Sequence, residues 1–450
     1  MNRRVSETPR QSLPPVKNRF GTFKGVFTPS ILTILGVIMY LRFGWVVGEA
    51  GLLGTIAIVL LAHAVSFTTG LSICAIATNR TVKTGGDYYM ISRSLGLPIG
   101  GALGIALFFA LGFSTSLYVL GFTESFLNVT GIPPTPTAIR IVGTISCLLL
   151  TALTFFSTDL ALKVQYIVLA AIGLSIVSLL MGGPDVPFRE SPLQMWFHPD
   201  GASFETVFAV FFPAVTGFTA GVAMSGDLKD PRRSLPLGTI AAITVGLAVY
   251  LLIPLFLIFN VDATVLREDN MVWMRVARFA PLVTAGVFAA TLSSALGSIL
   301  GAPRYLQALA WDHIIPGFLG RGHGPSNEPR IGTIVTFLVA EAGILIGELD
   351  FIARIVTMFF LTGYGFLCLA SGIQAWSGIA SWRPDFRVPA SVSFIGAAIC
   401  FALMFKLDTI AMAGASAVMV LIFLAIKRRE VAQNHRSVWS GFWAAPWGRA

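Results

Sequence analysis

Residues 208–221 read FAVFFPAVTGFTAG, an apolar membrane-spanning stretch that contains its own breaks near the middle. Pro213 cannot donate a backbone hydrogen bond, and its ring clashes with the carbonyl of Ala209 four residues earlier. Gly217 and Gly221 tolerate backbone angles that other residues resist. The pattern therefore predicts two half-helices separated by an unwound joint. Such a joint survives in hydrocarbon only where it faces protein or a watery cavity, so it marks a candidate binding site.

The composition places the whole chain in a membrane. Its 450 residues are 55% hydrophobic and only 12% charged, with a mean hydropathy of +0.78. A soluble protein of this length would be about one quarter charged. The apolar runs suit helices of about twenty residues, whereas a transmembrane β-barrel would show alternating segments of about ten. We therefore predict an all-α polytopic membrane protein, and we interpret the net charge of +9 as loop bias rather than affinity for nucleic acid.

Twelve apolar stretches are long enough to be spans, and together they form one predicted transporter domain at 25–427. They are 28–48, 53–77, 98–127, 138–156, 160–181, 204–226, 236–260, 278–302, 331–348, 352–375, 390–406 and 408–426. Lys and Arg gather in alternate loops, as at 80–93 and 229–233, which is typical of cytoplasmic loops. We therefore expect cytoplasmic tails at 1–24 and 428–450, in a plasma or inner cell membrane. The polar, basic start predicts no cleavable signal peptide.

The first span repeats the pattern of the sixth, with Pro29 followed by Thr33 and Gly36. Because the first span runs outward and the sixth inward, interrupted helices at these positions indicate an inverted repeat of five plus five spans, with two more appended. Facing breaks would bring partly negative carbonyl ends and partly positive amide ends to one point, where a cation and an anion could bind side by side. Residues 85–94 are too polar to span, and we interpret them as a gate or an interfacial helix.

The remaining polar residues suggest little chemistry. The cysteines have no metal-binding or redox spacing and are predicted to pack in the apolar interior: they are Cys74, Cys147, Cys368 and Cys400. His63 lies in an apolar span, where we favour neutral packing over an ionisable functional group. No catalytic constellation appears among the polar residues of the spans. We therefore predict that the protein is not an enzyme and needs no cofactor beyond transported ions.

Several motifs occur in an order that carries a family resemblance. They are GVIMYLRFGWVVG at 36–48, AIATN at 75–79, GGDYYMISRSLG at 85–96, SGDLKDP at 225–231, TLSSAL at 291–296 and WRPDF at 382–386. With these motifs the chain resembles the cation-chloride cotransporters, as a prokaryotic-type member similar to the sodium-coupled branch. That family belongs to the amino acid-polyamine-organocation superfamily, so the resemblance implies a LeuT-type fold. Its members are often dimers with a large cytoplasmic C-terminal domain, and a minimal form and a truncated sequence both remain open.

The resemblance implies a potassium site at the two broken helices and the third span. The matching positions are Thr33, Ile34, Tyr118, Pro213 and Thr216. A weakly hydrated monovalent cation prefers several neutral oxygens, which half-helix ends provide. Family members commonly have asparagine where this chain has Thr33, and the shorter hydroxyl puts potassium affinity in question. The structural alternatives are packing for Tyr118 and a simple kink for the proline and Thr216.

The resemblance places sodium between the first and eighth spans. The matching positions are the carbonyls of Leu32, Leu35 and Ala290 and the hydroxyls of Ser293 and Ser294. The paired serines favour sodium coupling, because the potassium-chloride branch lacks one of them. The alternative is that these small residues only allow close helix packing.

Two chloride positions are implied by the same resemblance, both built from backbone amides that begin half-helices. They map to Gly36, Val37 and Ile38, and to Gly217, Phe218 and Thr219, with a hydroxyl from Tyr364. Anion capture at a helix start needs no basic residue.

Arg42 and Glu124 lie at the outer ends of the first and third spans, and their family counterparts suggest an extracellular gate pair. The alternative is that each side chain extends separately to the membrane interface.

The sequence therefore predicts a secondary active transporter that carries chloride with sodium, and with potassium as an open third ion, by alternating access. The expected partners are the lipid bilayer and small inorganic ions, with a homodimer suggested only by analogy. The main alternative is an amino acid or amine permease of the same fold, although the residues at 33–35 leave little room for such a substrate. A channel or a membrane sensor is the third interpretation.

Overall fold

The computed structural model describes residues 20–79, 85–156, 158–182, 193–223, 228–323, 327–378 and 381–407, together with Met412 and Leu424. Apart from two isolated bridges, the regular structure of these residues is entirely helical. The helices are α1 Thr28–Ile34, α2 Val37–Leu41, α3 Phe43–Asn79, α4 Gly86–Leu95, α5 Leu97–Thr130, α6 Pro136–Phe156, α7 Thr158–Leu180, α8 Phe204–Phe211, α9 Ala220–Ala223, α10 Pro231–Asn260, α11 Ala263–Glu268, α12 Val272–Val276, α13 Ala280–Trp311, α14 Arg330–Ile346, α15 Leu349–Ser377 and α16 Ala390–Leu407. A π-helical turn, η1 Phe23–Phe27, precedes α1, and short 3-10 turns are η2 Phe212–Val215, η3 Gly217–Thr219 and η5 Gly317–Gly320.

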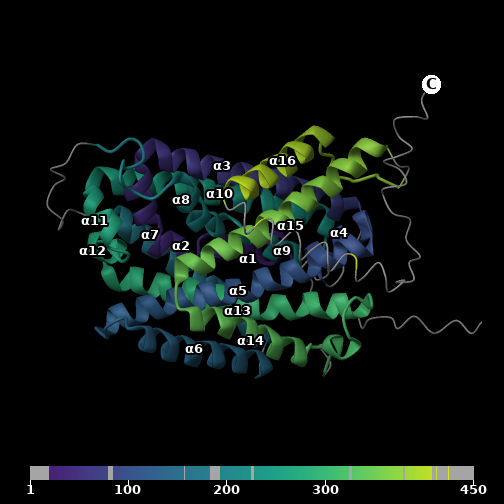
Figure 1. The fold of residues 1–450 in the computed structure, drawn as a ribbon, viewed down its shortest axis with the longest axis horizontal. Helices are drawn as coiled ribbons and strands as arrows, with labels where there is room; N and C mark the ends of the chain where they lie inside the picture. The colour runs from purple at the N-terminus through teal and green to yellow at the C-terminus, as the bar shows by residue number, and fades with distance from the viewer. Residues whose placement is uncertain are drawn as a thin grey trace, which may run out of the picture.

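The helices pack into one bundle. Figure 1 shows α6 beside α14 at one edge and α3 beside α16 at the opposite edge, with the short helices α1 and α2 between them. Within the described residues, nine helices are long and apolar enough to cross a membrane by length and composition. They are Phe23–Leu41, Phe43–Asn79, Leu97–Thr130, Pro136–Phe155, Phe204–Val222, Pro231–Asn260, Ala280–Trp311, Leu349–Ser377 and Ala390–Leu407. The prediction of an all-α polytopic membrane protein is confirmed.

Two further predicted spans form shorter helices. The apolar part of α7 is Val164–Leu180, and α14 has 17 residues. The predicted span at 408–426 falls almost wholly outside the described residues, as do most of the N-terminal tail and the whole segment at 428–450.

The first and second predicted spans meet at Gly51, where α3 bends with φ of 66°. A β-carbon at this position would lie 2.8 Å from the backbone of residues 194–196. Leu52 and Leu53 donate hydrogen bonds to the carbonyls of Gln194 and Met195 at 3.0 and 2.8 Å. The turn between these spans therefore needs glycine, both for its left-handed conformation and for the close approach of the 193–203 loop.

The polar helix α4 packs against α5, α13 and α15, and most of its residues are buried, including Asp87 and Tyr88. The polar groups of α4 explain this position, because they pair with Asp312, the residue directly after α13. Arg93 contacts Asp312 at 2.7 Å, and the Tyr88 hydroxyl donates to the same carboxylate at 2.6 Å.

Both predicted helix breaks are present, with different geometry. After α1, Leu35 (φ −85°, ψ 53°) and Gly36 (φ −97°, ψ −155°) leave the helix before α2 begins. In the sixth span the chain tightens into η2 and η3 on either side of Thr216 and never becomes extended. The expectation of an unwound joint was therefore wrong for this span. Pro213 stands in the first turn of η2, where its missing N–H and fixed φ disrupt the α-helix yet suit a new helical start.

Candidate functional site

The two interrupted helices cross in direct contact. A β-carbon on Gly217 would lie 2.2 Å from the β-carbon of Thr33, so only glycine permits this crossing. The Thr33 hydroxyl lies 2.7 Å from the Gly217 carbonyl, and the Ser30 hydroxyl donates to the Phe218 carbonyl at 2.8 Å. The structure therefore brings together residues 184 positions apart at the breaks that the sequence predicted. We call residues 32–38 and 212–219 the joint.

The break after α1 exposes carbonyls that a continuous helix would satisfy. The last four carbonyls of an α-helix have no partner inside it, and for α1 these include those of Leu32, Thr33 and Ile34. The Tyr250 hydroxyl of α10 donates to the Ile34 carbonyl at 2.8 Å. One oxygen predicted for potassium is therefore already hydrogen-bonded.

Carbonyls of the sixth span also have side-chain partners. Ser66 of α3 donates to the Val215 carbonyl at 2.8 Å, and Thr357 of α15 donates to the Ala209 carbonyl at 2.7 Å. The Thr216 hydroxyl donates to the Pro213 carbonyl at 2.9 Å.

Three of the residues that satisfy these carbonyls were not among the predicted site residues, namely Ser66, Tyr250 and Thr357. The signal that could have found them is a hydroxyl side chain inside an otherwise apolar span, since such a group must find a partner when buried.

Ser294 and Tyr118 lie beside the break in the first span. The Ser294 hydroxyl is 3.9 Å, and the Tyr118 ring 3.8 Å, from the point where a β-carbon on Gly36 would stand. Ser294 is buried, and its hydroxyl has no hydrogen-bond partner within the described structure. An unsatisfied buried hydroxyl costs roughly 1–3 kcal/mol. A bound cation beside the free carbonyls of α1 would remove that cost.

The other residues predicted for sodium lie on the same two elements. Ala290 is fully buried one turn before Ser294, and Leu32 and Leu35 are buried at the end of α1. Ser293 is only half-buried, and in the described residues no hydrogen bond joins its hydroxyl to the joint. Of the two serines, Ser294 is therefore the one that the structure places beside the break.

The amides predicted for chloride begin short helical segments. Val37 and Ile38 form the buried first turn of α2, after the extended residue Gly36. Amides in a first helical turn have no intrahelical acceptor, so these groups are able to face an anion.

Tyr364 lies at the second predicted chloride position, against residues 216–218. Its ring is 5.2 Å from that of Phe218, and its hydroxyl donates a short hydrogen bond to the Thr216 carbonyl. In this state the Tyr364 hydroxyl is therefore bonded to the backbone.

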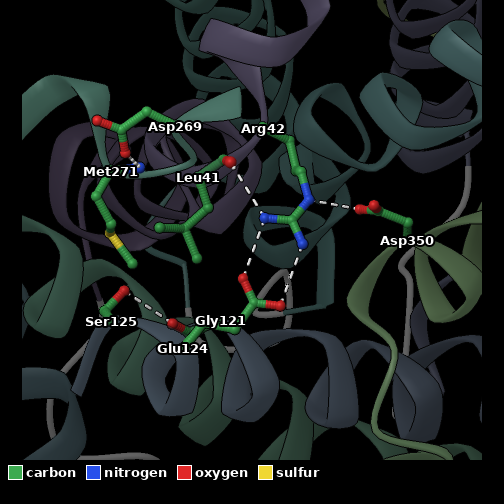
Figure 2. A network of polar contacts seen from close by, with 8 residues as sticks. All are labelled: Leu41, Arg42, Gly121, Glu124, Ser125, Asp269, Met271 and Asp350. Atoms are coloured by element: carbon green, nitrogen blue, oxygen red, sulfur yellow. Dashed lines mark hydrogen bonds and ion pairs between the residues drawn. The ribbon is translucent and has the colours of Figure 1, made fainter. Parts of the chain in front are cut away.

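The predicted gate pair is formed, with a third member. Arg42 is 5% exposed, and its two terminal nitrogens contact the two Glu124 oxygens at 3.0 and 3.1 Å. Its Nε contacts Asp350 in the first turn of α15 at 2.5 Å, as Figure 2 shows. Asp350 was not predicted, because only the fold brings the start of α15 to the ends of α2 and α5. This ion-pair cluster ties three elements together above the joint.

Two pockets lie away from the joint. One of about 440 Å³ is lined by residues of the 261–279 loop with Asn128, and one of about 1030 Å³ lies where α10 begins, near Asp385. No residue of the joint lines either pocket. In the described part of the chain, no group of three or more His, Cys, Asp or Glu residues is placed to hold a metal ion. Neutral carbonyl and hydroxyl oxygens, which suit alkali cations, are the groups that gather at the joint.

Interrupted helices that cross among apolar spans, next to an ion-pair cluster around the buried Arg42, define a class of polytopic membrane transporter. Comparison with known proteins gives the family. The family model described as "Amino acid permease" matches residues 25–446, so the chain belongs to this family.

Among curated relatives, solute carrier family 12 member 1 of Homo sapiens is 34% identical over 87% of this chain and 41% of its own. Solute carrier family 12 member 2 of Mus musculus is 35% identical over 87% of this chain and 37% of its own. The chain thus spans about two fifths of the length of these relatives. The predicted resemblance to the cation-chloride cotransporters is confirmed, and the matched proteins are membrane permeases and solute carriers rather than enzymes, as predicted.

Proposed function

We propose that this protein is a secondary active transporter that carries chloride together with sodium, with potassium as a third ion. The observation that carries the proposal is the buried Ser294 hydroxyl, which has no partner within the described structure and stands beside the interrupted first helix and Tyr118. A hydroxyl next to free main-chain carbonyls suits a small monovalent cation. The similarity to solute carrier family 12 supports the same substrate class.

The proposed fold is the LeuT-type inverted repeat of five plus five spans with two more appended, twelve in all. The breaks after Ile34 and around Thr216 support it, because they fall at equivalent places in the two halves. We further propose that both chain ends face the cytoplasm of a plasma or inner cell membrane, and that the protein assembles as a homodimer.

The ion sites proposed for this fold follow the predicted residues. Sodium binds at Leu32, Leu35, Ala290, Ser293 and Ser294, and potassium at Thr33, Ile34, Tyr118, Pro213 and Thr216. Chloride binds at the amides of 36–38 and of 217–219, the latter with Tyr364. The Ile34 carbonyl has a second lone pair for potassium beside its hydrogen bond from Tyr250, whereas chloride binding at Tyr364 requires its single O–H to leave the Thr216 carbonyl.

The structure supports a state that is closed on the outer side. Val37 and Phe211, on the outer side of the joint, are fully buried beneath the Arg42 cluster, whereas Thr33 and Thr219 are half-buried on the other side. Alternating access then requires the Arg42 cluster to separate while the opposite side closes.

Uptake of radioactive chloride into proteoliposomes tests the proposal. We expect uptake to require external sodium and to stop when choline replaces it, and we expect rubidium, as a potassium substitute, to accelerate it. The alternative function is amino acid transport, which the family model favours. A panel of amino acids that inhibits chloride uptake, or sodium-independent amino acid uptake by the same vesicles, would support that alternative.

A further inference from the structure

Asp87 is a carboxyl group buried in the protein beside the proposed ion path. It is 1% exposed, in the first turn of α4. In the part of the chain that the structure describes, its carboxyl takes part in one hydrogen bond, a long one of 3.4 Å from the Tyr305 hydroxyl of α13. Across the described residues, no Lys, Arg or His lies within ion-pair distance of it. A buried carboxylate without a cation is costly, whereas a neutral carboxylic acid is tolerated.

Within the described residues, the elements packed against α4 supply no compensating charge. Charged or titratable groups on the parts of α3, α13 and α15 near α4 are Cys74, Arg304, Tyr305, Asp312, Tyr364 and Cys368. Of these, Tyr305 donates a hydrogen bond to Asp87, and Asp312 is paired with Arg93. Residues 97–117 of α5 contain no titratable side chain. Burial raises the pKa of Asp87 to about 7, and the hydrogen bond from Tyr305 opposes this rise.

The surroundings of Asp87 connect it to the joint. Helix α4 packs against α15, whose Tyr364 donates its hydroxyl to the Thr216 carbonyl. The other end of α4 is held by the Arg93–Asp312 ion pair at 2.7 Å. The first turn of α4, which carries Asp87, therefore packs with a buried carboxyl group. A charge on that carboxyl group weakens the packing of this end of the helix.

We propose that Asp87 is a proton-binding site beside the ion path, protonated while α4 is packed against α13 and α15 and deprotonated when water reaches it. On release, the carboxyl O–H bond breaks, the proton passes to that water, and the carboxylate becomes hydrated. Proton binding stabilises the outward-closed arrangement described above, so acidification on the side of α4 slows turnover. This transport consequence rests on the proposed function, whereas the protonation itself does not.

Thermal unfolding in detergent at a series of pH values tests the protonation without any transport. Because the folded protein holds the proton to higher pH than the unfolded chain, stability falls as pH rises from about 4 to about 7. Asp87→Asn mimics the protonated carboxyl and should remove this part of the pH dependence. Glu348→Gln, which changes an exposed acid at the start of α15, is the matched control and should leave it unchanged. Parallel curves for the wild type and Asp87→Asn would overturn the proposal.

Chloride uptake at varied internal pH tests the consequence. We expect an inflection near pH 7 in the wild type and the Glu348→Gln control, and a flat profile for Asp87→Asn. Tyr305→Phe removes a hydrogen bond that favours the charged form, so it should move the inflection to higher pH. An unchanged inflection in Asp87→Asn, or no shift in Tyr305→Phe, contradicts the proposal. If the wild type carries no chloride at any pH, the proposed function fails, and the unfolding measurements still decide the proton site.

Infrared titration covers the case in which Asp87→Asn does not fold. A protonated carboxyl band in the wild type that persists well above pH 4, and whose midpoint rises in Tyr305→Phe, supports the site. Loss of every such band near pH 4 contradicts it.

Discussion

The hydroxyl of Thr357 in α15 donates a hydrogen bond of 2.7 Å to the carbonyl of Ala209 in α8. That carbonyl is the acceptor that Pro213 leaves unpaired, because proline has no N–H to donate four residues later. Thr357 is fully buried, so water does not replace its hydroxyl as the hydrogen-bond donor to this carbonyl. The break in the sixth span is therefore stabilised by a side chain of the tenth, which meets the requirement that backbone groups at membrane depth be satisfied by protein.

Replacing Thr357 with Val keeps the side-chain shape and removes the donor. We expect the free energy of unfolding to fall by about 1–3 kcal/mol, because a buried carbonyl is left without a partner. Thr357→Ser keeps the hydroxyl and should cost less. In a Pro213→Ala background a backbone N–H is restored opposite Ala209, so Thr357→Val should cost less there. Unfolding in detergent measures all four variants, and an equal cost of Thr357→Val in both backgrounds would contradict this account.

Local chemistry explains why the sequence located both breaks. Pro213, Gly217 and Gly36 act on their own backbone, so their effect is visible without knowledge of the fold. The partners of the freed carbonyls, such as Tyr250 and Thr357, come from other spans and depend on how helices are rotated and packed. Asp350 has the same origin. Nothing in the spacing of the sequence connects it to Arg42, 308 positions away.

The shape of the sixth-span break was harder to predict than its position. Proline and glycine permit both an extended joint and a 3-10 turn. The Thr216 hydroxyl bonds back to the Pro213 carbonyl at 2.9 Å, and Tyr364 bonds to the Thr216 carbonyl. These contacts favour the tighter turn. At the first break the Thr33 hydroxyl contacts carbonyls before the break, those of Pro29 and Ser30, and the chain opens at Gly36 into an extended residue.

The two acids of the Arg42 cluster should contribute unequally. Glu124 makes two contacts with Arg42 and its side chain is 22% exposed, whereas Asp350 makes one and is 49% exposed. Solvent screens the more exposed pair. We expect Glu124→Gln to lower the chloride uptake rate about tenfold, as loss of a buried charged hydrogen bond would, and Asp350→Asn to lower it less. Thermal unfolding of each variant controls for misfolding, and a larger effect of Asp350→Asn would refute this ranking.

Ser294 allows packing and ion binding to be separated. Its hydroxyl has no partner in the described structure, so Ser294→Ala should not destabilise the protein in sodium-free buffer and should raise the free energy of unfolding by up to about 1–3 kcal/mol. Sodium should stabilise the wild type, and a tenfold weaker affinity would remove about 1.4 kcal/mol of that stabilisation at saturating sodium. Ser298→Ala, one turn further along α13, is the control and should respond to sodium normally. A Ser294→Ala variant that is destabilised without sodium yet keeps the full sodium response would assign the residue to packing.

The contact between Thr33 and Gly217 should be the least tolerant point of the joint. A β-carbon on Gly217 would stand 2.2 Å from the β-carbon of Thr33, so Gly217→Ala must separate the two interrupted helices. We expect loss of chloride uptake and a stability cost of about 1–3 kcal/mol, as for other overpacked sites. Thr33→Gly removes the opposing atoms and should recover part of the stability in the double variant.

Gly221→Ala is not a suitable control, because its β-carbon would also meet backbone, at 2.7 Å from the Val26 carbonyl. Gly297→Ala, where no atom lies within 4 Å, is the matched change and should be neutral. If Thr33→Gly gives no recovery, the clash at this crossing is not what limits the variant.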